Sequence, residues 1–360
     1  MGNFLKIFYF AVISFFLMGS VAYANEPTSA SEAHEEVNVK ELILEHLADS
    51  YMWHVTKVGD HDIVIPLPVI VYSQTSGWHV FLSSALHGGE EHEGLVIAEA
   101  GDNKGKIVEL VNGQEVKPFD ISITKVSFTL IMSSILLIII VMSVAGSYKK
   151  DPLSARKGFH GFMEMFIMNI NDDVIKPCVG KDYKKFAPYL LTVFFFIFLN
   201  NLLGLIPFFP GGANVTGNIA VTFVLAVCTF LIVNIFGTKE YWREIFWPEV
   251  PLWLKVPIPL MPAIELVGVF TKPFALMIRL FANILAGHSI VLGLTCLVFV
   301  TVKLGVGMNA SMSIVSVLFS VFISLVELLV AYIQAYVFTM LSAVFIGLAR
   351  VEPHHAHKHN

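Results

Sequence analysis

Uncharged runs dominate the part of this 360-residue sequence that follows residue 125. Val126–Tyr148 and Phe186–Thr238 contain no Asp, Glu, Lys or Arg, while Pro273–Val302 and Leu304–Ala349 contain one such residue each. About 20 apolar residues are enough to cross the hydrocarbon core of a bilayer as a helix. The whole sequence is 56% hydrophobic and only 14% charged, which lies outside the range of soluble proteins. The sequence therefore predicts an all-α polytopic membrane protein.

The membrane domain is expected to comprise residues 125–350 and to cross the bilayer five times. The turn sequence PFFPGGANVTGN at 207–218 divides the second uncharged run into two spans. The segment GFHGFMEMFIMNINDDVI at 158–175 has mixed polarity, which predicts an amphipathic helix along the membrane interface. The last two segments, about 259–302 and 308–348, are roughly twice as long as a perpendicular span requires. Both are therefore expected to be strongly tilted.

Residues 1–24 have the features of a cleaved secretory signal peptide. A weakly basic start with Lys6 precedes the apolar run IFYFAVISFFLMG, and Ala22 and Ala24 provide the small residues of a cleavage site. A retained first transmembrane helix is the alternative interpretation. At the other end, residues 351–360 form a polar, His-rich tail.

Residues 25–124 form a block of different composition. They hold 17 Asp and Glu residues against five Lys and no Arg. The pattern predicts a helix over 31–55 and then short strands at 62–73, 78–84 and 106–113, separated by Gly and Pro. A small, acidic, exported α+β domain is the simplest interpretation.

The distribution of Lys and Arg predicts the orientation of the membrane domain. The connection at 149–185 carries eight of these residues, whereas the turn at 207–218 carries none. Because basic loops stay in the cytoplasm, the turn is expected to face outward and the C-terminus to lie inside. This orientation places the N-terminal domain outside, in agreement with a signal peptide.

Arg279 is the only formal charge between Pro273 and Val302. Burying a guanidinium at the membrane centre costs about 2.5–3.5 kcal/mol on insertion scales and about 10–17 kcal/mol in simulations. Arginine also keeps its proton at any physiological pH. The sequence therefore predicts a functional, permanent positive charge, with structural snorkelling as the alternative. No carboxylate lies within a helical turn of Arg279, so its counter-charge is expected to come from another subunit.

Few other polar residues occur in the last two segments. At 100° per residue, Glu265 and Asn283 share the face of Arg279, whereas His288 points to the opposite side. An antiparallel pairing that sets Gln334 level with Arg279 brings His288 beside Glu327. Titratable groups on both sides of one fixed cation then predict two separate proton-accessible paths. Interfacial, packing or ordinary hydrogen-bonding roles for these side chains remain the alternatives.

Several motifs, in this order, resemble subunit a of the F-type ATP synthases, the membrane stator that faces the rotating c-ring. They are NNLLGLIPF and TGNIAVT between residues 200 and 222, KPFALMIRLFANILAGHSIV at 272–291 and AYIQAYVFTMLSAVFIGLA at 331–349. The resemblance covers about residues 125–350, and residues 25–124 have no counterpart in most members of the family.

The resemblance implies roles for individual residues. Arg279 matches the family's essential arginine, and Gln334 matches the glutamine close to it. His288 and Glu327 match a coupled pair that many bacterial members carry in the reverse order, and the exchange keeps one histidine and one carboxylate. The positions implied to line the half-channels are Glu265 and Asn283, together with Asn200, Asn201 and Asn218 for the outer one.

The implied protein is a proton-translocating component of the synthase and not an enzyme on its own. Its expected partners are the c-ring, the subunit b peripheral stalk, other synthase subunits and the lipid bilayer, in the inner membrane of a Gram-negative-type bacterium. No cofactor, metal site or nucleic-acid partner is expected, since the sequence contains no P-loop, GxGxxG or CxxC motif.

Other interpretations stay open from the sequence. A proton-coupled secondary transporter also holds charges at mid-membrane, but internal repeats typical of such proteins are not visible. A structural scaffold subunit would not need a lone arginine with flanking titratable groups. The histidines of HGGEEHE and of the C-terminal HHAHKH could bind a metal or simply be solvated. Protons are favoured over Na⁺ by the His288 and Glu327 pair.

Overall fold

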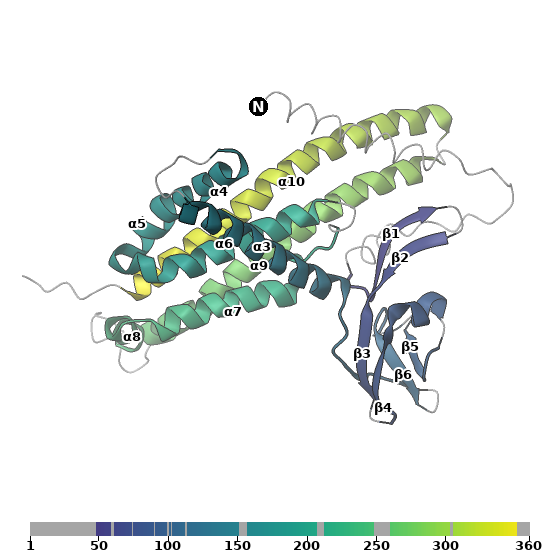
Figure 1. The fold of residues 1–360 in the computed structure, drawn as a ribbon, viewed down its shortest axis with the longest axis horizontal. Coiled ribbons are helices and arrows are strands. Elements are labelled where there is room, and N and C mark those ends of the chain that lie inside the picture. The colour runs from purple at the N-terminus through teal and green to yellow at the C-terminus, as the bar shows by residue number, and fades with distance from the viewer. Residues whose placement is uncertain are drawn as a thin grey trace, which may run out of the picture. The chain divides into compact units, whose positions relative to one another are not determined.

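We describe the protein from a computed structural model (Figure 1). The predicted signal peptide and the His-rich tail lie outside the described residues. The structure describes residues 48–350 apart from 59–60, 74, 90, 99–100, 102, 112–113, 151–156, 207–211, 248–259 and 303–304.

Short antiparallel strands make up most of the region before residue 121. The strands β1 and β2 form a hairpin, while two three-stranded sheets have the orders β4-β3-β8 and β5-β6-β7. The strand bounds are β1 Met52–Val58, β2 His61–Pro66, β3 Pro68–Ser73, β4 Gly77–Leu82, β5 Leu95–Ile97, β6 Ile107–Val111, β7 Gln114–Val116 and β8 Phe119–Asp120. A 3₁₀ helix, Ser83–Gly89, follows β4.

The strands agree with the sequence pattern at β2, β3, β4 and β6, but the predicted helix over 31–55 is wrong at its end. Met52 to Val55 belong to β1, where Trp53 pairs with Ile65 of β2. Aromatic and β-branched residues suit a hairpin, and pairing with β2 satisfies backbone groups that a helical turn would otherwise have bonded. The earlier part of that predicted helix lies outside the described residues.

The small core of this region follows the alternation of the strands. Val69 and Val71 on β3 are fully buried, and they cluster with Leu86, Leu95 and Ile107. Since successive side chains of a strand point to opposite faces, this burial leaves the residues between them on the outer face of β3.

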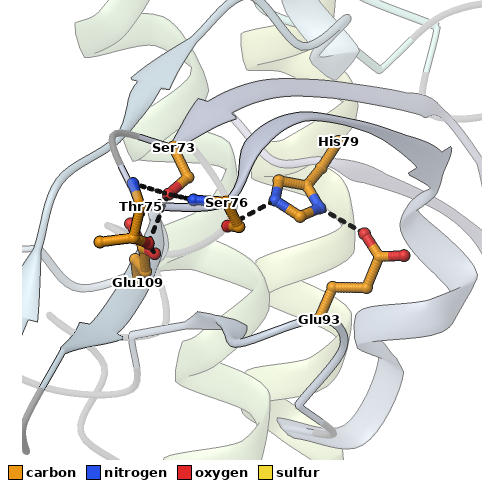
Figure 2. Close-up of polar contacts among 6 residues, drawn as sticks. All are labelled: Ser73, Thr75, Ser76, His79, Glu93 and Glu109. Carbon is orange, nitrogen blue, oxygen red and sulfur yellow. Dashed lines mark hydrogen bonds and ion pairs between the residues drawn. The ribbon is translucent and has the colours of Figure 1, made fainter.

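Two polar networks accompany this core (Figure 2). Ser73 donates a 2.7 Å hydrogen bond to Glu109, and Thr75 donates to the other carboxylate oxygen. These bonds hold the pKa of Glu109 below its usual range. His79 lies between the Ser76 hydroxyl, 2.8 Å from Nε2, and a Glu93 carboxylate oxygen at Nδ1.

The rest of the described chain is helical. Its elements are α3 Lys125–Lys150, α4 Gly158–Asn169, a π-helical turn Ile170–Ile175, α5 Lys176–Val179, a 3₁₀ turn Gly180–Asp182, α6 Tyr183–Gly204, α7 Ile219–Ile235, α8 Lys239–Phe246, α9 Leu260–Thr301 and α10 Val306–Ala349. In the described chain, four helical stretches are long and apolar enough to cross a membrane, or five if the bent pair α7 and α8 is one span. The helical part therefore fits the predicted polytopic all-α membrane protein.

The two longest helices, α9 and α10, pack against each other (Figure 1). They contain 42 and 44 residues, which corresponds to about 63 and 66 Å at 1.5 Å per residue. The second half of α10 is buried, for example at Ala335 and Ile346, whereas Ile314, Leu318 and Phe322 in its first half are exposed. One half of α10 is thus packed within the chain, and the other presents an apolar surface.

Aromatic rings fill the centre of the helical core. Phe166 of α4 stacks on Phe198 of α6 at 5.9 Å between ring centroids, and the Tyr332 ring of α10 meets both edge-on. Phe194 of α6 joins the same cluster and is fully buried. These contacts fix α10 against α6, and so fix the position of the polar side chains that α10 carries.

Candidate functional site

The packing of α9 on α10 brings His288 and Glu327 together. The distance from His288 Nδ1 to Glu327 Oε1 is 3.6 Å, and the side chains are 19% and 13% exposed. That carboxylate oxygen is buried and has no hydrogen-bond partner among the described residues. Because buried polar atoms are normally hydrogen-bonded, an acceptor is left facing the space beside His288.

Gly287 makes this approach possible. A Cβ atom added at this position would overlap with Glu327 Oε1. Any larger residue would therefore displace the carboxylate or separate the two helices. The sequence interpretation did not single out Gly287, although a glycine inside a helical segment and directly before a polar residue is a signal for close approach.

The pair lines a cavity of about 20 Å³, which is enough for about one water molecule. It brings together five residues singled out in the sequence, namely Asn200, Asn201, Asn283, His288 and Glu327, with two that were missed, Asn214 and Thr216. Asn200 Oδ1 is a second buried acceptor without a partner in the described chain.

Thr216 and Asn201 connect three elements at this cavity. Thr216 Oγ1 donates to Asn201 Oδ1 at 2.5 Å, and Asn201 Nδ2 donates to the Ala331 carbonyl of α10 at 3.3 Å. The segment before α7 is thereby held against α6 and α10. Asn218 is not among the cavity's lining residues, because its side chain caps α7 by accepting the Ala220 amide at 2.9 Å.

Arg279 lies on α9 between this cavity and the start of the helix, and its side chain is exposed. Within the described ranges, no carboxylate forms an ion pair with Arg279, and no hydrogen bond joins it to the buried Gln334 of α10. An exposed cation on an apolar helix calls for a counter-charge from outside the described residues.

A second cavity of about 20 Å³ lies on the other side of Arg279 along α9, at Val269, Lys272 and Pro273. Lys272 precedes Ile284, at the first cavity, by 12 residues, or about 18 Å of helix. The Lys272 ammonium also lies 5.8 Å from the centre of the Phe345 ring. Lys272 was not identified from the sequence as a site residue, because it lies directly before Pro273, where the run with Arg279 as its single charge begins.

Polar groups of α7 and α8 complete the second cavity. Asn234 of α7 and Tyr241 of α8 line it, and Asn234 Oδ1 is buried without a partner among the described residues. Glu265, which is exposed, does not line this cavity but lies within electrostatic range of Tyr241. Two separate cavities, each lined in part by polar side chains, therefore flank the level of Arg279.

The fold and these cavities define a polytopic helical membrane protein with polar groups inside its bundle. Residues 127–347 match the family described as ATP synthase A chain, and the chain belongs to this family. Residues 42–125 match a family described as a domain of unknown function (DUF8433).

Curated relatives support the same family. The chain is 44% identical over 306 residues to ATP synthase subunit a of Chlorobium phaeobacteroides (strain DSM 266), which covers 80% of this chain and 85% of the relative. It is 47% identical over 245 residues to ATP synthase subunit a 2 of Chlorobaculum tepidum, where the match spans 65% of each chain. It is 37% identical to ATP synthase subunit a of Myxococcus xanthus, over 77% of this chain and 90% of the relative.

Proposed function

We propose that this chain is the proton-translocating stator subunit of an F-type ATP synthase membrane sector. Membership of the ATP synthase A chain family supports this function. The observation that carries the mechanism is Arg279, an exposed guanidinium without a carboxylate partner in the described chain and with a cavity lined in part by polar side chains on each side along α9. The subunit is a component of the synthase and catalyses no reaction alone.

The outer proton path runs through the cavity at His288 and Glu327. The unpartnered oxygens of Asn200 and Glu327 accept hydrogen bonds from water that delivers the proton. His288, with Nδ1 3.6 Å from the carboxylate, has two ring nitrogens that can donate or accept a hydrogen bond along this path. This pair favours protons over Na⁺ as the transported ion.

The rotor meets the chain at Arg279. The exposed apolar residues that precede it on α9, such as Phe274 and Ile278, provide a surface for a c-ring helix. Arg279 attracts the ionised carboxylate of the rotor and lowers its proton affinity locally. Once protonated, that carboxylate is neutral and can turn into lipid, where a charged one would be very costly.

The inner path begins at the second cavity and ends near Glu265. Asn234, Tyr241 and Lys272 line or flank the route by which the proton leaves. Because Arg279 separates the two cavities, a proton passes between them only by travelling on the rotor. A transmembrane potential supplies about 2.3 kcal/mol per charge per 100 mV to this cycle.

The proposed topology has five crossings, with α4 along the interface and α9 and α10 tilted. The signal peptide over 1–24 directs export and is cleaved, the acidic domain over 25–124 is exported, and the C-terminus is cytoplasmic. The subunit then lies in the bacterial inner membrane beside the c-ring and the subunit b stalk, and it needs no cofactor or nucleic acid.

Replacing Arg279 with Ala tests this function. We expect proton-driven ATP synthesis by the complete synthase in inverted vesicles to be abolished, because the fixed charge that ionises the rotor carboxylate is lost. Arg243→Ala is the matched control, since it removes an exposed arginine of α8 that pairs with Glu240. Coupled synthesis that survives in Arg279→Ala, measured at equal amounts of assembled complex, would contradict the proposal.

A further inference from the structure

The outer face of the β4-β3-β8 sheet is apolar across all three strands. Paired residues of an antiparallel sheet share a face, so the pairs Tyr72 with Trp78 and Ile70 with Val80 lie together on it. Trp78 and Val80 are 60% and 70% exposed. The described residues that form this outer face are Pro68, Ile70, Tyr72, Trp78, Val80, Leu82, Phe119 and Ile121, and none of them is charged.

A surface of this kind requires an occupant. Contiguous apolar patches are rare on soluble surfaces and mark contact with a protein or a membrane. The uncharged face contrasts with the acidic composition of the region around it. Residues 25–124 hold 17 acidic residues, and none of them lies among the described residues of this face.

The connection to the first span limits where this sheet can lie. The strand pairing continues past β8, because the Ile121 amide donates to the Ile70 carbonyl and the Ile123 amide to the Pro68 carbonyl. The span candidate α3 begins at Lys125, two residues later. Two extended residues reach at most about 7 Å. The interfacial layer on each side of the hydrocarbon is itself about 5–8 Å thick, so this end of the sheet lies at the membrane surface.

The start of α3 is also tied to the strand region. The Lys125 amide donates to the Ser50 carbonyl at 2.8 Å, and the Val126 amide donates to an Asp49 carboxylate oxygen at 3.1 Å. The strand region is therefore not separated from the span by a free linker.

We propose that the outer face of the β4-β3-β8 sheet lies on the lipid bilayer and inserts its aromatic side chains into the interface. Trp and Tyr prefer this layer because one end of each ring is apolar and the other is polar. A protein partner would be expected to meet about one hydrogen-bonding group per 100–200 Å². The side chains of this face offer only the Tyr72 hydroxyl and the Trp78 indole N–H. The proposal requires only that α3 crosses the membrane, and so it does not depend on proton translocation.

Spin labels provide the test. Single cysteines replace Val80 or Phe119 on the face, and Leu110 on β6 of the other sheet is the matched control, all in a chain whose Cys178, Cys228 and Cys296 are replaced by Ala. The full chain is placed in nanodiscs at one copy per disc, and the assembled synthase in the same lipid. Accessibility to oxygen, which concentrates in lipid, is compared with accessibility to a water-soluble nickel complex.

In both preparations, labels at 80 and 119 are expected to be more accessible to oxygen than to the nickel complex. The label at 110 is expected to remain accessible to the nickel complex. Preference for nickel at 80 and 119 would place the face in water and overturn the proposal. Protection from both reagents in single-copy discs would show that another segment of this chain covers the face. Protection that arises only in the synthase would assign it to a partner protein, and either result overturns the proposal.

A second measurement avoids cysteine replacement. Lipids brominated near the headgroup quench tryptophans at the interface. At equal protein concentration, wild type should lose more fluorescence in absolute terms than Trp78→Phe, because the difference between the two losses is the part contributed by Trp78. Equal absolute losses in the two proteins would also overturn the proposal.

Discussion

Arg279 and Gly287 lie about two turns apart on α9 and constrain the candidate site in different ways. Arg279 contributes a charge that no described residue neutralises, whereas Gly287 contributes the absence of a side chain. The charge of Arg279 requires a partner that supplies a negative charge. The missing side chain of Gly287 determines how close the carboxylate of Glu327 comes to His288. Charge alone would therefore not define the outer path.

Gly287→Ala should impair proton transfer. The added methyl group would overlap with Glu327 Oε1 and move it from His288, so we expect slower proton flux through the membrane sector in vesicles. Gly293→Ala is the control on the same helix, since a Cβ there meets no atom within 4 Å. This control should keep full flux and gain up to about 1 kcal/mol of helix stability. Equal flux in the two variants would argue against a role for Gly287.

At this scale the sequence predicted the polar residues but not all of their neighbours. The meeting of His288 with Glu327 follows from helical periodicity and an antiparallel register, and the 3.6 Å distance agrees with it. Thr216 and Asn214 could not be found in this way, because they lie in an irregular segment whose position depends on contacts with Asn201. Helical periodicity carries no information about such contacts.

Among the elements, α10 depends on close contact at its C-terminal end. A Cβ at Gly347 would overlap with the backbone carbonyl of Cys178 in α5. The buried half of α10 is thus seated directly on the short helices that precede α6, while its first half remains free for a partner. Small residues let helix backbones approach in this way within membranes.

Gly347→Ala should weaken this packing. Because backbone atoms of Cys178 cannot rotate away as a side chain can, overpacking is expected to cost about 1–3 kcal/mol. Thermal denaturation of the purified subunit in detergent would report a lower midpoint than in wild type. Gly268→Ala on α9, where a Cβ meets no atom within 4 Å, should not lower the midpoint. A Gly347→Ala midpoint at or above that of Gly268→Ala would exclude a tight contact.

The elements themselves were largely predictable where charge is scarce. The predicted apolar segments 259–302 and 308–348 matched α9 and α10 to within a few residues, since a membrane forces long apolar segments into helices. The prediction was wrong at Met52–Val55, where the pattern resembled a helix but pairing with β2 makes these residues part of a strand. Local sequence cannot show which distant strand will satisfy a backbone.

At the scale of the whole molecule, the strand region and the helical region are stabilised by different forces. The helical part packs apolar and aromatic side chains across a surface that lipid or partner subunits cover. The strand region has a small core and relies in addition on bonds to carboxylates, such as those of Ser73 and Thr75 to Glu109. The bonds to Glu109 make the stability of the strand region depend on pH.

The strand region should therefore lose stability in acid. Hydrogen bonds lower the pKa of Glu109 and of Glu93 from the ordinary 4.5. Their stabilisation is complete above that value. It is lost as the pH falls through the lowered pKa, because the unfolded chain binds protons first.

Amide hydrogen exchange of β3 and β6 in the full chain, corrected for intrinsic rates, should accelerate below about pH 4.5. Glu109→Gln should flatten this dependence and Glu115→Gln, an exposed position on β7, should not. An unchanged pH dependence in Glu109→Gln would mean that its bonds to Ser73 and Thr75 contribute nothing to folding.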